Sequence, residues 1–255
     1  MGELEISRRD QAHGAMSEVL FSVERDGLQV PAFAWLPTGR RHASVVLIGH
    51  GGSGHKAIDR HHRLALRLVV GSGVACLAID GPYHGDRAVP GDGPLDYQQR
   101  VVAEGPAAVH DRMSQDWLTV LAAASEEWSL DGDAVGYLGL SMGSRYGLGV
   151  CAALGARLQA AVIGTFGLAA DDPMMVAMAA DDLLRTSAAE ITAPVLHHVQ
   201  WDDEVFPRGG QLQLFDLFAS PEKIMRARPG AHGETRTDDE AAWCEHLSSR
   251  LAEKV

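Results

Sequence analysis

The 255-residue sequence has little cysteine, few basic residues for its acidic content, and no long apolar run. Its three cysteines, Cys76, Cys151 and Cys244, form no CxxC pair and lie in apolar or helical runs. We therefore expect buried free thiols in a reducing compartment. Lys and Arg number 22 against 34 Asp and Glu, a formal net charge of −12. This acidity disfavours nucleic acid and anionic membranes as partners, because both attract basic proteins.

The apolar segments are also too short to span a bilayer, and the polar first residues contain no signal-peptide core. Ile6 stands where N-myristoylation prefers Ser or Thr. The sequence thus predicts a cytoplasmic protein with no membrane partner. Hydrophobic residues make up 46% of the chain. That share supplies a full core for one α/β domain over residues 1–255.

Short apolar runs alternate with amphipathic segments along most of the chain. The first two predicted strands, 17–24 and 28–36, meet at Asp26-Gly27, and Pro31 favours an edge position for the second. Later apolar runs alternate with helices, as in a parallel sheet covered on both faces. The pattern predicts about eight strands, the first two antiparallel. The later strands are expected at 43–49, 74–79, 134–140, 160–166, 194–199 and 223–227, and the helices at 56–70, 109–128, 142–154, 173–189, 210–218 and 238–252.

One segment carries a candidate nucleophile: Gly139-Leu140-Ser141-Met142-Gly143 has the form G-x-S-x-G. It follows an apolar strand and opens a predicted helix, the setting in which this motif makes a sharp turn that exposes the serine hydroxyl. Bulky neighbours would clash at such a turn, and the two glycines avoid this. A glycine-rich turn with an incidental serine is the alternative interpretation.

A serine nucleophile needs a base, and His232 is the predicted one. It lies in a loop at 229–233 that directly follows a strand. The other downstream histidines, His197, His198 and His246, lie within a strand or a helix, where packing roles are expected.

The base needs an orienting carboxylate, and the acidic loop 201–207 also follows a strand. Spacing alone leaves Asp202 and Asp203 open. The loop His50-Gly51-Gly52-Ser53-Gly54 is the predicted oxyanion loop, because glycine lets the backbone approach a substrate closely. Gly52 is the preferred N–H donor, with Ser53 as the alternative.

The order of these motifs (HGG loop, G-x-S-x-G, acidic loop, terminal histidine) resembles the α/β-hydrolase superfamily, and its dienelactone-hydrolase-like and small serine carboxylesterase branch. The resemblance implies an α/β-hydrolase fold with a minimal cap, a mostly parallel sheet, a Ser141–His232–Asp203 triad, an oxyanion hole of Gly52 and Met142, and no cofactor. The stretch 203–207 matches the family pattern D-x-V-x-P, which favours Asp203 over Asp202. In the loop 79–87, His84 resembles a histidine that braces the family's active-site loop.

Two features depart from the family. The nucleophile is serine where dienelactone hydrolases use cysteine, and Val199-Gln200 replaces a His-Gly pair. A serine also disfavours the dehalogenases and epoxide hydrolases, which use aspartate there.

The sequence therefore predicts a serine hydrolase acting on a small ester, lactone or thioester. Acyl transfer, carbon–carbon bond hydrolysis and a non-catalytic binding module remain alternatives. We expect segments 81–108 and 170–190 to cover the site, with Met174, Met175 and Met178 either lining an acyl pocket or packing on the core. The sequence leaves two roles for Arg145: binding a substrate carboxylate or anchoring a loop.

The first half of the chain contains many histidines, but they form no H-E-x-x-H or similar metal-binding motif. We therefore expect no metal site. His61 and His62 lie among arginines on a predicted helix, so a solvated face is expected for them. No oligomeric state follows from the sequence.

Overall fold

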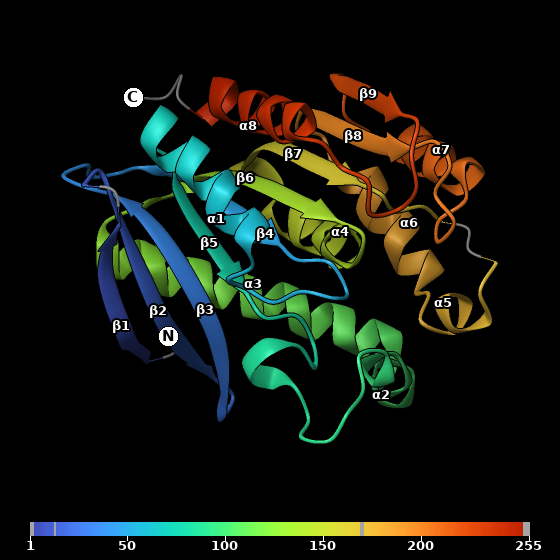
Figure 1. Cartoon of the computed structure of the whole chain (residues 1–255), viewed down its shortest axis with the longest axis horizontal. Coiled ribbons are helices and arrows are strands. Elements are labelled where there is room, and N and C mark those ends of the chain that lie inside the picture. The colour runs from blue at the N-terminus through green and yellow to red at the C-terminus, as the bar shows by residue number, and fades with distance from the viewer. Residues whose placement is uncertain (1–2, 13, 169–170, 252–255) are drawn as a thin grey trace.

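The computed structural model describes residues 3–12, 14–168 and 171–251. A nine-stranded sheet runs through it in the order β1-β2-β3-β5-β4-β6-β7-β8-β9 (Figure 1). From β5 to β9 the neighbours are parallel, while β1, β2, β3 and β5 pair antiparallel. The strands are β1 (Leu4–Ala12), β2 (Met16–Arg25), β3 (Leu28–Pro37), β4 (Ser44–Gly49), β5 (Ala75–Ile79), β6 (Asp131–Leu140), β7 (Leu158–Gly164), β8 (Val195–Gln200) and β9 (Lys223–Arg228).

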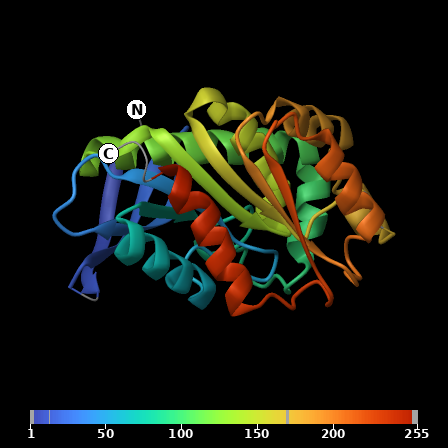
Figure 2. The same cartoon turned by 90° about the horizontal axis from the view of Figure 1, so that it is seen from above.

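Helices cover both faces of this sheet (Figure 2). Helices α1 and α8 lie on one face, and α3, α4, α6 and α7 lie on the other. The helices are α1 (Asp59–Ala65), α2 (Asp96–Glu104), α3 (Pro106–Trp128), α4 (Met142–Leu154), α5 (Pro173–Ala177), α6 (Asp181–Glu190), α7 (Arg208–Leu217) and α8 (Thr237–Leu251), with short turns η1 (Leu66–Val70), η2 (Gly85–Arg87) and η3 (Gly155–Arg157).

The central strands are apolar on both sides because both faces are covered. In β4, Val45 and Leu47 face the α3–α4 side, while Val46 and Ile48 face the α1–α8 side. All four side chains are fully buried. The expected mostly parallel sheet flanked by helices is confirmed. The loops after β4, β5, β6, β8 and β9 carry the candidate functional residues, and the carboxyl ends of parallel strands meet at one edge.

The start of the sheet differs from the prediction. Strand β1 was not expected, because its sequence LEISRRDQA alternates only weakly between apolar and polar residues. Those of its side chains that the structure describes are mostly exposed, and the strand adds a ninth strand to the sheet by pairing with β2. The edge position inferred from Pro31 is wrong, since β3 lies between β2 and β5. Its register with β5 begins only at Ala32, so Pro31 is outside that ladder.

Other local differences concern segments without strong periodicity. The predicted loop from 81 to about 106 contains α2, and the predicted helix 173–189 is two helices, α5 and α6.

The solvated face expected for His61 is wrong: this side chain is buried, and its Nδ1 lies 2.9 Å from the Lys56 carbonyl. Burial lowers the pKa of His61 to about 3. Residues 169–170 and 252, at the ends of predicted segments, lie outside the described residues.

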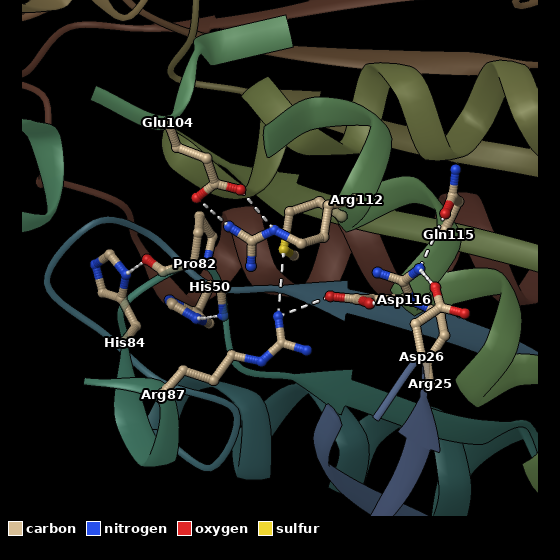
Figure 3. Close-up of polar contacts among 12 residues, drawn as sticks. Arg25, Asp26, His50, Pro82, His84, Arg87, Glu104, Arg112, Gln115 and Asp116 are labelled. Carbon is tan, nitrogen blue, oxygen red and sulfur yellow. Dashed lines mark hydrogen bonds and ion pairs between the residues drawn. The ribbon is translucent and has the colours of Figure 1, made fainter. Parts of the chain in front are cut away.

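Two ion clusters, each with a buried carboxylate, tie the loop after β5 to the rest of the protein. Lys56 Nζ lies 2.7 Å from Asp80 Oδ2 and 2.6 Å from Asp86 Oδ2, and the Lys56 N–H donates to Asp80 Oδ1 at 2.8 Å. Asp116 of α3 accepts from Arg25 of β2 and from Arg87, at 2.7 and 2.8 Å (Figure 3). A buried carboxylate is stable only with such partners.

The free, buried state of Cys76, Cys151 and Cys244 agrees with expectation. No helix in the described part of the chain is long and apolar enough to cross a membrane.

We predict that Gly139→Val destabilises the protein by at least about 3 kcal/mol. An added Cβ would lie 2.5 Å from the carbonyl carbon and oxygen of Gly143, which belong to backbone. Gly71→Ala is the matched control, since its Cβ would meet nothing within 4 Å. Urea unfolding measures both; a Gly139→Val protein that unfolds like the wild type contradicts the prediction.

Candidate active site

Ser141 lies on a sharp turn between β6 and α4. Its backbone has φ 56° and ψ −119°, a conformation that L residues rarely adopt. The turn needs glycine because an added Cβ on Gly143 would lie 2.4 Å from the Gly49 carbonyl oxygen. The Ser141 N–H donates to the Gly164 carbonyl at 2.9 Å, and the Tyr137 hydroxyl donates to the Gly143 carbonyl at 2.7 Å. Hydrogen bonds to β7 and from β6 thus hold the turn in place.

The structure brings Ser141, His232 and Asp203 together from the ends of β6, β9 and β8. Ser141 Oγ lies 2.9 Å from His232 Nε2, and His232 Nδ1 lies 2.9 Å from Asp203 Oδ2. A carboxylate only accepts, so Nδ1 carries the hydrogen and Nε2 is left to accept from the serine hydroxyl. This is the geometry that a serine nucleophile requires.

Of the two candidate acids, Asp203 contacts the His232 ring and Asp202 does not. The Asp203 side chain is fully buried, and its Oδ1 accepts from the N–H groups of Val205 and Phe206 at 2.9 and 2.8 Å. Asp202 is exposed and accepts from the Gly230 N–H at 3.3 Å.

Sequence reasoning missed two groups that hold these loops. Glu204 accepts from the His232 N–H at 2.9 Å, and that backbone contact lowers the pKa of its carboxyl. The buried Gln211 of α7 donates to the Phe206 carbonyl at 2.7 Å and to Asp203 Oδ2 at 3.3 Å. No motif marks either residue, because both act through backbone that only the fold brings near.

The predicted oxyanion loop lies beside Ser141: an added Cβ on Gly51 would be 4.0 Å from Ser141 Cβ. His50 holds this loop. Burial lowers the pKa of His50 to about 4, so its ring is neutral at pH 7. The Gly81 N–H donates to Nε2 at 2.7 Å, which leaves Nδ1 to donate to the Gly51 carbonyl at 2.8 Å. In the trans peptide that follows, the Gly52 N–H points away from this carbonyl.

His84 holds the next peptide of the same loop. Its Nε2 lies 2.8 Å from the Gly52 carbonyl. Figure 3 shows the contact on the other side of the ring, where Nδ1 lies 2.7 Å from the Pro82 carbonyl. Tyr97 packs on this ring, with centroids 4.4 Å apart. Gly52 has no side chain to restrain it, and these neighbours restrain it instead.

A cavity of about 250 Å³ opens over Ser141 and His232. Gly52, Ser53 and Met142 line it, and Met142 begins α4, where the first N–H groups have no helical partner. Its other walls are mostly apolar and come from α4, from the loop after β8, and from the α2 and α5 regions, which contribute Leu95, Tyr97, Met175 and Met178. Met174 is absent from this lining.

The described residues contain no group of three or more His, Cys, Asp or Glu side chains suited to a metal ion.

Comparisons with solved structures match this fold over nearly the whole chain. A cold-adapted esterase from an Arctic intertidal metagenomic library, solved with bound PEG, is 30% identical with a TM-score of 0.80, covering 96% of this chain and 98% of that one. The acetyl xylan esterase from Paenibacillus sp. R4 is 19% identical with a TM-score of 0.76, covering 98% and 89%. A putative dienelactone hydrolase from Klebsiella pneumoniae subsp. pneumoniae MGH 78578 is 17% identical with a TM-score of 0.71, covering 94% and 99%.

The last two likenesses concern the fold alone, whereas the first also extends to sequence. No protein-family model and no curated protein matches the sequence. The chain belongs to the α/β-hydrolase superfamily and is related in sequence to the cold-adapted esterase.

We predict that Gly52→Ala slows the reaction of Ser141 with a fluorophosphonate about 10- to 100-fold. The added Cβ would lie 2.6 Å from the Tyr97 hydroxyl oxygen, which is a clash. The next nearest atom, Tyr97 Cζ, would be 3.4 Å away, which is an ordinary contact distance. Removing that hydroxyl removes the clash, so the double variant Gly52→Ala/Tyr97→Phe should recover most of the rate lost.

Tyr97→Phe alone is the control for losing the hydroxyl. The prediction fails if the Gly52→Ala protein reacts with the fluorophosphonate as fast as the wild type. It also fails if the double variant reacts no faster than Gly52→Ala alone.

Proposed function

We propose that this protein is a serine ester hydrolase that cleaves a small ester, lactone or thioester through an acyl-enzyme on Ser141. The hydrogen-bonded chain from Ser141 through His232 to Asp203 carries the proposal. The esterases among the similar structures support the reaction class.

In the proposed mechanism, His232 Nε2 accepts the Ser141 proton as Oγ attacks the carbonyl carbon. Asp203 keeps the ring in the required tautomer and stabilises the imidazolium that forms. The N–H groups of Gly52 and Met142 donate to the developing oxyanion. The imidazolium then protonates the leaving group, and a water activated by the same ring hydrolyses the acyl-enzyme.

The surroundings of the site support a small substrate. The cavity measures about 250 Å³ and is mostly apolar. Part of its wall comes from segments 81–108 and 170–190, which we propose cover the site of a single-domain enzyme. No residue of the proposed mechanism needs a cofactor. The three free buried thiols support a reducing, cytoplasmic setting.

We predict that a fluorophosphonate labels the wild-type protein at Ser141 and that Ser141→Ala abolishes labelling. The same change should lower kcat for p-nitrophenyl esters by about 10⁴-fold or more. Peptide mapping locates the label, and release of free acid without added alcohol or amine separates hydrolysis from acyl transfer. A folded wild-type protein that neither labels nor hydrolyses any ester overturns the proposal in favour of a binding module.

Asp203→Asn should lower kcat about 10³- to 10⁴-fold, because an amide in place of Oδ2 no longer accepts from His232 Nδ1. Its remaining oxygen still accepts from Val205 and Phe206, so the loop should keep its shape. Asp202→Asn is the matched control, one residue away and exposed, and should stay within about threefold of the wild type. Steady-state kinetics decide, and the assignment is wrong if Asp202→Asn is the more damaging change.

A further inference from the structure

Arg145 lies one helical turn after the nucleophile, and its N–H donates to the Ser141 carbonyl at 3.0 Å. Arg145 is buried, with only 5% of its surface exposed. It lines the cavity over Ser141 and also a neighbouring cavity of about 330 Å³. The two cavities share Met175 and Phe206 as well, so Arg145 lies at their junction.

The contacts of the Arg145 guanidinium leave its charge without a counter-ion. Nη1 donates to the Met178 carbonyl at 2.9 Å, Nη2 lies 3.7 Å from Met175 Sδ, and the group lies 5.6 Å from the centre of the Phe166 ring. No carboxylate in the described part of the chain lies within 4.0 Å of Arg145. Nine other arginines with described side chains do form ion pairs with carboxylates: Arg8, Arg25, Arg63, Arg87, Arg100, Arg112, Arg226, Arg228 and Arg250.

Burial without a carboxylate is unfavourable for a cation. It lowers the pKa of Arg145, against smaller raising effects of Tyr146, Tyr97 and Asp181. The positive charge also acts on a neighbouring histidine. Burial lowers the pKa of His110 to about 3, and repulsion by Arg145 contributes to this decrease. Anchoring α5 through the Met178 carbonyl needs one neutral donor and does not account for a buried charge.

The walls around Arg145 would attract an anion. The described lining of the cavity over Ser141 contains no Asp or Glu, and Arg145 is its one permanent charge. In the neighbouring cavity the one acid in the described lining is Asp181, which is exposed at the start of α6. Apolar walls strengthen a charge-assisted contact to a carboxylate, which the planar guanidinium can bind through two N–H groups.

We propose that Arg145 binds a carboxylate carried by the substrate, so that the preferred substrates are esters, lactones or thioesters with a free carboxylate several bonds from the reacting carbonyl. This rests on the proposed function of Ser141. The cavity at Ser141 receives the reacting carbonyl, while the junction one helical turn away, roughly 5 Å along α4, receives the carboxylate.

The first test compares kcat/KM for matched anionic and neutral esters. Monoethyl adipate is paired with ethyl hexanoate for a carboxylate on the acyl side, and 4-acetoxybutanoate with its methyl ester for the alcohol side. The wild type should prefer the anionic member of at least one pair. Arg145→Gln, which keeps a donor for the Met178 carbonyl but no charge, should lower that preference about 10- to 100-fold. Arg145→Lys should retain part of it.

Asp181→Asn is the control of opposite charge, and it should leave the preference intact or increase it. A preference for neutral esters in both pairs, or a preference that survives Arg145→Gln, overturns the proposal. An equal loss on both members of a pair assigns Arg145 to anchoring α5 alone and also overturns it.

A binding measurement separates this proposal from the hydrolase proposal. Calorimetry with monoethyl adipate and with 4-acetoxybutanoate uses the Ser141→Ala protein, which cannot turn either ester over, and the Ser141→Ala/Arg145→Gln protein. At least tenfold weaker binding of one of these esters by the double variant supports the carboxylate site even if the wild type hydrolyses nothing. Equal binding of both esters by the two proteins overturns it, whatever the activity of Ser141.

Discussion

The positive φ of Ser141 is the constraint on which the site depends. A serine with φ 56° persists only if its surroundings hold it there. Two glycines permit the turn, and β7 fixes it through the Gly164 carbonyl. The same turn starts α4, which places the Met142 N–H and Arg145 beside the nucleophile. One backbone conformation thus sets the positions of three groups to which we assign proposed roles.

Most of the fold followed from the sequence because buried parallel strands have a distinctive composition. β4, β5 and β7 are nearly all apolar, and at least one glycine lies in the loop after each of them. Strand β1 escaped prediction because an exposed antiparallel strand needs no apolar pattern; its pairing with β2 defines it. The inference from Pro31 was wrong for a related reason. A proline shows only that one residue donates no backbone hydrogen bond, and a strand can still pair on both sides through its other residues.

The candidate site was predictable where chemistry restricts residue type, and less so elsewhere. Ser141 and His232 stand in loops whose composition marks them. Asp202 and Asp203 are adjacent, and only the fold separates them, burying one carboxylate against the ring and exposing the other. The contacts of Gln211 and His50 join groups to backbone carbonyls, which carry no side-chain identity and leave no mark in a sequence.

The ion cluster of Lys56, Asp80 and Asp86 makes two neighbouring loops one unit. Lys56 follows the oxyanion loop, whereas Asp80 and Asp86 flank the segment that carries His84. His50 and His84 add cross-links between the same two segments. Loop exchange between related hydrolases, a common route to new specificity, would therefore have to move both segments at once. Either loop transplanted alone would lack the counter-charge that the other loop supplies.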